Sequence, residues 1–191
     1  MVSMVAMKGH PGSGKSSIAQ SLAKSLKWAL LDKDDVRDST LPLQSLVASA
    51  LNDLSYAVVW RMADTQLKCG TSIIVDSPLS RPHLFQEAAA LAAQHGARLL
   101  IVECRAGNEE EWRRRLEDRA QRSPSWHKPH SWEALMNLVE GYSGCCDYDT
   151  PQAKKLVVNT TCNLEREALN DRVLDWVRRA DMATPAVTFL P

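Results

Sequence analysis

Glycines, a lysine and a serine near the start of the chain have the spacing of a phosphate-binding loop. Residues 9–16 read Gly-His-Pro-Gly-Ser-Gly-Lys-Ser and match G-x-x-x-x-G-K-[ST] at every fixed position. Glycines let successive backbone N–H groups turn toward one anion, and a helix starting behind them adds its positive dipole end. Lys15 can reach the β- and γ-phosphates, and the Ser16 hydroxyl can ligate Mg²⁺. We expect nucleotide contacts from Gly9, His10, Pro11, Gly12, Ser13, Gly14, Lys15, Ser16 and Ser17.

Two other kinds of site fit this stretch less well. One alternative is a glycine turn between a strand and a helix that carries a surface lysine. A dinucleotide-binding fingerprint, G-x-G-x-x-G, is excluded because Ser17 stands where its third glycine would be.

Three carboxylates and an arginine follow the second apolar run, where residues 31–37 read Leu-Asp-Lys-Asp-Asp-Val-Arg. One turn of helix would put Asp34 and Arg37 on the same face. A carboxylate beside the terminal phosphate can accept the proton of an attacking hydroxyl, and an arginine can hold an anionic or hydroxylated substrate. We therefore expect Asp34 to be catalytic and Arg37 to bind substrate. The alternative is that Asp34 or Asp35 caps the following segment.

Another acid ends the third apolar run. Residues 72–75 are followed by Asp76, and an acid after such a strand holds Mg²⁺ directly or through water in many nucleotide sites. Arg81 follows in a Ser-Arg-Pro turn, where it is either a substrate contact or a solvated surface arginine. Trp60 lies on a helical stretch and either lines the substrate pocket or belongs to the core.

A row of arginines marks the charged segment 108–122. Its acids come first and its bases later, which suits the helix dipole and is typical of a solvated charged face. Arg115, Arg119 and Arg122 nevertheless share one side of this helix. Such a row can neutralise charge that develops on a transferred phosphoryl group. We expect Arg115 and Arg119 to be catalytic.

The elements that position these residues alternate along the chain. Short apolar runs typical of buried strands cover residues 1–7, 28–31, 72–75, 98–102 and 156–158. Helical patterns cover residues 16–27, 41–69, 82–94, 108–122, 131–141 and 164–180. This alternation predicts an α/β fold with a doubly wound parallel sheet, whose ligands bind beyond the carboxyl ends of the strands. The helix, loop and helix within residues 113–142 form a candidate moving lid.

Length and composition bound the remaining choices. The 191 residues predict one domain, residues 1–182, followed by a tail, residues 183–191. Lys plus Arg equals Asp plus Glu, 23 each, so nothing in the charge balance favours nucleic acid or a membrane surface as partner. Five cysteines without metal-like spacing suit a reducing compartment. With neither a membrane-length apolar run nor room for a leader before the first strand, we expect a cytoplasmic protein, monomeric or homodimeric.

Taken together, these residues resemble the P-loop small-molecule kinases, the group that holds adenylylsulfate, gluconate and shikimate kinases and the kinase domain of polynucleotide kinase. Residues 31–37 are similar to that group's D-x-D-x-x-R segment. The resemblance implies that Asp34 contacts or deprotonates the acceptor hydroxyl, that Asp32 lies near Mg²⁺, and that Arg37 holds the substrate.

The rest of the resemblance concerns the lid and the nucleotide. The group's lid motif R-x-x-x-R is similar to Arg115 and Arg119, which would then bracket the phosphates, with Arg119 also at the adenine. The segment 159–163, with Thr160 and Thr161, corresponds to the loop that wraps the adenine edge. The fold implied is a five-stranded parallel sheet of order 2-3-1-4-5 with helices on both faces.

The function expected from all of this is ATP- and Mg²⁺-dependent transfer of the γ-phosphate to a hydroxyl of a small-molecule metabolite. Two alternatives stay open. One is a nucleotide-dependent switch or ATPase that acts through protein partners. The other is a kinase for nucleic-acid ends, which the neutral charge disfavours because phosphate contacts need a basic track.

Overall fold

Parallel strands form the centre of the molecule in the computed structural model, which describes residues 2–43, 45, 47–122, 125–151 and 153–182. Within these residues the sheet consists of β1 (Ser3–Lys8), β2 (Ala29–Asp32), β3 (Ile73–Asp76), β4 (Arg98–Arg105) and β5 (Lys154–Asn159). The strand order is β2-β3-β1-β4-β5, and every neighbouring pair is parallel. The predicted sheet and its 2-3-1-4-5 order are therefore confirmed.

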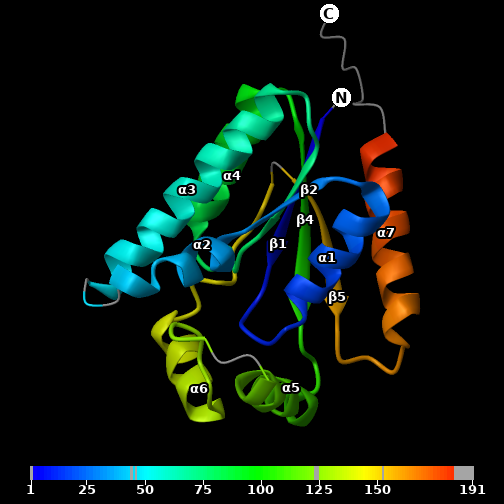
Figure 1. The fold of residues 1–191 in the computed structure, drawn as a ribbon. Coiled ribbons are helices and arrows are strands. Elements are labelled where there is room, and N and C mark those ends of the chain that lie inside the picture. Colours follow the sequence, from blue (N-terminus) through cyan, green and yellow to red (C-terminus); the bar gives the residue numbers. More distant parts are fainter. Residues whose placement is uncertain (1, 44, 46, 123–124, 152, 183–191) are drawn as a thin grey trace, which may run out of the picture.

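Helices cover both faces of this sheet, as Figure 1 shows. The described helices are α1 (Lys15–Leu26), α2 (Lys33–Ser39), α3 (Ala48–Lys68), α4 (Pro82–Gln94), α5 (Glu109–Arg122), α6 (Trp132–Gly141) and α7 (Arg166–Met182). The pair α3 and α4 lies on one side of the sheet, and α1 and α7 lie on the other. Helices α5 and α6 lie below the carboxyl ends of the strands, where the lid was predicted.

Two hydrophobic clusters explain why the strands are almost wholly apolar. Met4 and Ala6 of β1 belong to the cluster under α3 and α4, whereas Val5 and Met7 belong to the cluster under α1 and α7. Successive side chains of a strand point to opposite faces, so a strand covered on both sides must be apolar at every position. The sheet is thereby held rigidly between two layers of helices, and its carboxyl edge is a fixed platform.

One predicted helix is shorter than expected. The pattern predicted helix over residues 41–69, but α3 begins at Ala48, after a single 3₁₀ turn at Leu41–Leu43. Pro42 lacks an N–H and disfavours helical geometry in the residue before it, which explains why α2 does not continue into this stretch. A proline is tolerated in the first turn of a helix, so Pro42 does not explain why α3 begins only at Ala48.

Helix α2 is longer than the single turn expected after β2. It begins where the Asp32 carboxylate accepts a hydrogen bond from the Asp34 backbone N–H at 2.8 Å. Asp32, not Asp34 or Asp35, is therefore the capping residue of this segment.

The predicted tail, residues 183–191, and residues 123–124 of the predicted lid lie outside the described residues. Among the helices that are described, none combines the length and the apolar character needed to span a membrane.

The substitution Leu100→Ala tests how much the buried side chains of the strands contribute to the stability of the fold. Its side chain is fully buried in the middle of β4. We expect Leu100→Ala to lower the free energy of unfolding by about 2–5 kcal/mol, because it leaves a cavity that the packed sheet cannot close. Urea denaturation measures the change. Leu54→Ala, at a side chain 45% exposed on α3, is the matched control and should shift stability by about 0.5 kcal/mol or less. Equal effects of the two variants would contradict this account of the core.

Candidate active site

The chemistry-bearing residues meet at the carboxyl edge of the sheet. The glycine-rich loop follows β1, Asp32 ends β2 and Asp76 ends β3. The register between β2 and β3 pairs Asp32 directly with Asp76. Because parallel strands all end at the same edge, segments far apart in the sequence are brought to one point.

The loop has the backbone that its glycines allow. Gly9 has φ 139°, and a Cβ added there would lie 2.3 Å from the backbone oxygen of Cys104, so no larger residue fits. Gly14 has φ 84° and precedes α1, whose N-terminus therefore faces the inside of the loop. Lys15 Nζ donates to the backbone oxygen of His10 at 2.9 Å, which folds this side chain over the loop. Burial lowers the pKa of Lys15.

Helix α5 contacts the outer side of the glycine-rich loop. Trp112 Nε1 donates to the backbone oxygen of Pro11 at 2.8 Å. The His10 ring lies between Trp112 and Tyr142, with ring centroids 6.0 and 5.9 Å apart. The expectation from sequence gave Trp112 no role. The available signal was an aromatic residue in an otherwise charged helix.

The paired acids form a site suited to a hard cation. Burial raises the pKa of Asp76, although Lys15 and the hydrogen-bonding Ser16 hydroxyl oppose the shift. Burial, and then the charge of Asp76, raise the pKa of Asp32 to about 7. Asp76 Oδ2 is buried without a hydrogen-bond partner. A hydroxyl and carboxylate oxygens are the ligands that Mg²⁺ prefers, so these residues fit the ion.

The number of protein ligands at this site can be compared with the number that Mg²⁺ takes from a protein. The described part of the chain contains no group of three or more His, Cys, Asp or Glu side chains arranged for a metal. Mg²⁺ in nucleotide sites usually keeps waters and phosphate oxygens and takes only one or two carboxylates from the protein. Ser16, Asp32 and Asp76 together offer one hydroxyl and two carboxylates, which is within the number that Mg²⁺ takes from protein in such sites.

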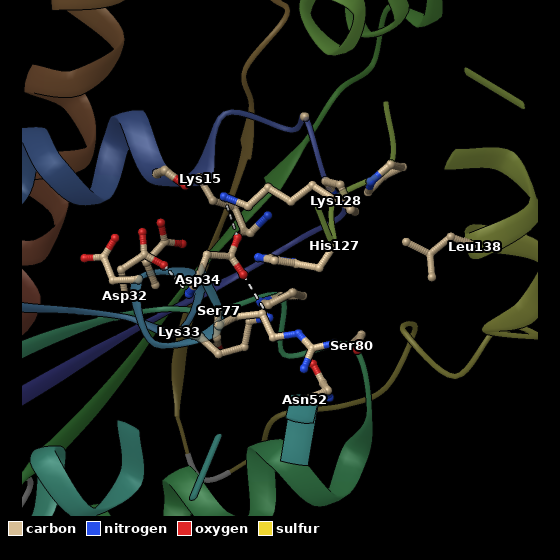
Figure 2. Close-up of a pocket in the computed structure, with 18 of the residues that line it drawn as sticks. Lys15, Asp32, Lys33, Asp34, Asn52, Ser77, Ser80, His127, Lys128 and Leu138 are labelled. Carbon is tan, nitrogen blue, oxygen red and sulfur yellow. Dashed lines mark hydrogen bonds and ion pairs between the residues drawn. The ribbon is translucent and has the colours of Figure 1, made fainter. Parts of the chain in front are cut away.

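Asp34 is an ionised carboxylate between two lysines. Its Oδ1 lies 2.8 Å from Lys33 Nζ and its Oδ2 lies 3.0 Å from Lys128 Nζ. Burial raises the pKa of Asp34, but the two lysines outweigh burial and hold it well below its usual range. Figure 2 shows Asp34 between Lys33 and Lys128, with Lys15 and Asp32 nearby. Sequence reasoning singled out Asp34 but neither lysine.

Arg37 is nearly fully buried beside this carboxylate. Its Nη2 donates to the backbone oxygen of Ala48 at 3.0 Å, and its guanidinium lies 4.5 Å from the centroid of the Trp126 ring. Nη1 has no hydrogen-bond partner. Arg37 also lines the large cavity, and the protein leaves this buried donor unsatisfied.

The two predicted lid arginines have different partners. Arg115 binds Glu111 through Nε at 2.7 Å and donates from Nη1 to the backbone oxygen of Thr160 at 3.0 Å. Arg119 donates from Nη2 to the backbone oxygen of Pro129 at 2.8 Å. Both arginines line the cavity, but their planar groups are engaged with the protein itself.

A single large cavity unites most of the predicted residues. Its volume is about 1340 Å³, and it is lined by Pro11, Gly12, Gly14, Lys15, Ser16, Ser17, Asp32, Asp34, Arg37, Trp60, Asp76, Arg81, Arg115 and Arg119, among others. Trp60 contributes its ring while its Nε1 donates to Glu87 at 2.7 Å. Arg81 stands exposed at the rim. The cavity is large enough for a nucleotide and a second small molecule together.

The other predicted residues do not line this cavity. Gly9, His10 and Ser13 border a smaller cavity of about 330 Å³ behind the loop. Thr160 Oγ1 donates to the backbone oxygen of Ser13 at 2.8 Å, so this side chain supports the loop from behind. Thr161 Oγ1 accepts from the Asn108 N–H at 2.8 Å.

Comparison with known proteins identifies the domain type. A family model described as an AAA domain matches residues 4–141. Among solved structures, a Chloroflexus aurantiacus protein is 21% identical, with a TM-score of 0.76 and coverage of 94% of this chain and 98% of that one. No curated protein sequence matches the chain significantly.

Two further structures carry bound nucleotides. Kti12 of Chaetomium thermophilum, in complex with ADP-AlF3, is 18% identical, with a TM-score of 0.70 and coverage of 94% and 100%. The Mycobacterium tuberculosis APS kinase CysC, in complex with AMPPNP and APS, is 18% identical, with a TM-score of 0.63 and coverage of 93% and 98%. At these identities the likeness concerns the fold, and it confirms the predicted P-loop kinase fold.

The raised pKa of Asp32 makes stability depend on pH. In the unfolded chain an Asp titrates near pH 4, whereas Asp32 titrates at about 7 in the fold. The folded state therefore binds more protons within this window, and stability falls as pH rises through it. We expect Asp32→Asn, which keeps a capping side chain, to make that fall shallower. Asp76, whose pKa burial also raises, contributes a slope of the same sign, whereas His10 and His127, whose pKa values burial lowers, contribute a slope of the opposite sign.

Urea midpoints measured from pH 4 to pH 8 check this expectation. The control is Asp171→Asn, at an exposed position on α7 outside the cavity. A slope for Asp32→Asn as steep as that of the wild type and the control would contradict the assignment.

Proposed function

We propose that this chain, which belongs to the AAA domain family, is a phosphotransferase that moves the γ-phosphoryl group of ATP, with Mg²⁺, to a hydroxyl of a small molecule. The observation that carries the proposal is the position of Asp34. This ionised carboxylate faces the same cavity as Lys15 of the glycine-rich loop. A triphosphate held by the loop and a hydroxyl held at Asp34 would therefore meet in one cavity.

The donor side of the cavity supplies positive charge and backbone N–H groups. The loop and the N-terminus of α1 would hold the phosphate chain, and Lys15 would exchange its bond to the His10 carbonyl for phosphate oxygens. Ser16, Asp76 and Asp32 would hold Mg²⁺. When bound, this ion neutralises charge on the β- and γ-phosphates.

The acceptor side supplies a proton acceptor and a positioning group. Asp34 would orient the acceptor hydroxyl and take its proton as the phosphoryl group leaves ADP. Its low pKa makes it a weak base in the resting pair with Lys33 and Lys128. Catalysis would therefore come mainly from alignment and charge stabilisation, which suits the loose transition state of phosphoryl transfer. Arg37 would hold a polar group of the acceptor through its unpartnered Nη1.

A second candidate function is a nucleotide-dependent switch that acts through a protein partner. It is favoured by the contacts of Trp112 and His10, because they connect the loop to helices α5 and α6. Nucleotide binding at the loop would then move the lid. This candidate gives no use to Asp34 and Arg37, so phosphotransfer explains more of the cavity.

A coupled assay of ADP release over a panel of hydroxyl-bearing metabolites tests the proposal. We expect one class of acceptor to raise ATP turnover above the rate without acceptor. Asp34→Asn should then lower the acceptor-dependent turnover about 10²- to 10⁴-fold, because it removes the proton acceptor and leaves the size of the side chain unchanged.

The matched control is Asp171→Asn, which makes the same replacement on α7 and should keep full turnover. Full acceptor-dependent turnover by Asp34→Asn would show that Asp34 is not the base. ATP turnover that no acceptor changes, with a partner retained only in the ATP-bound state, would favour the switch.

A further inference from the structure

Lys128 occupies the middle of the cavity, although it comes from the lid. Its Nζ lies 3.0 Å from Asp34 Oδ2, and its side chain is only 28% exposed. Its charge favours the ionised form of Asp76 as well as that of Asp34. Figure 2 shows its side chain extending toward Lys15. Lys128 therefore stands where the donor side and the acceptor side of the cavity meet.

The segment that carries Lys128 is fixed to its neighbours. We call residues 125–130 the strap. Trp126 packs on the Arg37 guanidinium, with 4.5 Å to the ring centroid. Asp38, also on α2, accepts a hydrogen bond from Ser125 Oγ at 3.1 Å and lies 3.0 Å from His127 Nε2.

Helix α5 holds the other side of the strap. Arg119 donates to the backbone oxygen of Pro129 at 2.8 Å, next to Lys128 in the chain. The strap is thus attached to α2 and to α5 at once. Such attachment sets where the ammonium group of Lys128 lies, in contrast to a lysine on a free surface loop.

The two lid arginines are bound to other protein groups, whereas Lys128 brings its positive charge to Asp34. Arg115 is bound to Glu111 and to the Thr160 carbonyl, and Arg119 is bound to the strap. Arg119 thereby acts as a positioning residue for the strap. Lys128 is a compact ammonium group whose partner is the very carboxylate that an acceptor hydroxyl would approach.

We propose that Lys128 is a further catalytic residue, whose ammonium group moves from Asp34 to the oxygens of the phosphoryl group during transfer. The inference rests on the proposed function. The acceptor oxygen forms the new bond to phosphorus, and the bond from phosphorus to the β,γ-bridging oxygen breaks, with its electron pair passing to ADP. The acceptor proton passes to the Asp34 carboxylate, and Lys128 stays protonated throughout.

Binding of MgADP with and without aluminium fluoride tests the role of Lys128 without knowledge of the acceptor. Aluminium fluoride beside ADP resembles the phosphoryl group in the transition state of transfer. A residue that acts only in the transition state therefore changes the affinity of the fluoride complex and not that of MgADP alone. Fluoride should increase the affinity of the protein for MgADP. We expect Lys128→Met to reduce this increase by a factor of about 10² and to leave the affinity for MgADP alone unchanged. Lys128→Arg, which keeps the charge, should retain more of the gain. Isothermal titration calorimetry measures both affinities.

Lys68→Met is the matched control, because Lys68 is exposed at the end of α3 and lies outside the cavity. A full fluoride gain in Lys128→Met would overturn the role of Lys128 and leave the proposed function standing. Equal losses for MgADP with and without fluoride would overturn it as well, because they indicate a structural role. If the wild-type protein binds MgADP but gains nothing from fluoride, the role of Lys128 at the phosphoryl group is overturned. Failure of the proposed function would show instead as ATP turnover that no acceptor changes.

Discussion

Strand register forces two carboxylates to lie side by side, and the rest of the site depends on that pairing. Asp32 and Asp76 are partners at the ends of two buried parallel strands. Burial raises the pKa of both groups, the charge of Asp76 adds to the shift of Asp32, and Lys15 opposes the shift of Asp76. Such a site favours binding of a divalent cation, which removes the repulsion, and the phosphates then balance the cation. Binding of a nucleotide with its cation would thus offset the unfavourable burial of two neighbouring carboxylates.

A second carboxylate environment lies two residues away from the first. Asp32 has a pKa raised to about 7, whereas Asp34 is held well below its usual range by Lys33 and Lys128. Neighbouring acids whose environments push their pKa values apart generally serve different roles. Under the proposed function, the pair would divide the cavity into a metal side and an acceptor side. The strap and α5 then bring further charge to the boundary, so donor, acceptor and lid meet at one place.

The sequence predicted the parts of the site that depend on local pattern. Strands buried on both faces are apolar throughout, and a parallel sheet places Lys15, Asp34 and Asp76 at one edge. Local pattern placed the start of α3 too early, near residue 41 instead of at Ala48, because helical periodicity continues into the segment before the helix. It also could not assign Lys128. That lysine reaches Asp34 only because the strap crosses onto α2, and this crossing depends on the packing of Trp126 against Arg37.

The fate of the γ-phosphoryl group tests the central claim most directly. The protein would be incubated with ATP that carries radioactive phosphorus in the γ-position, together with a small-molecule extract of its source cells. The proposed function predicts that the label passes to an organic phosphate ester, because Asp34 and the glycine-rich loop line the same cavity. Label that appears only in inorganic phosphate, at the same rate with and without the extract, would contradict phosphotransfer.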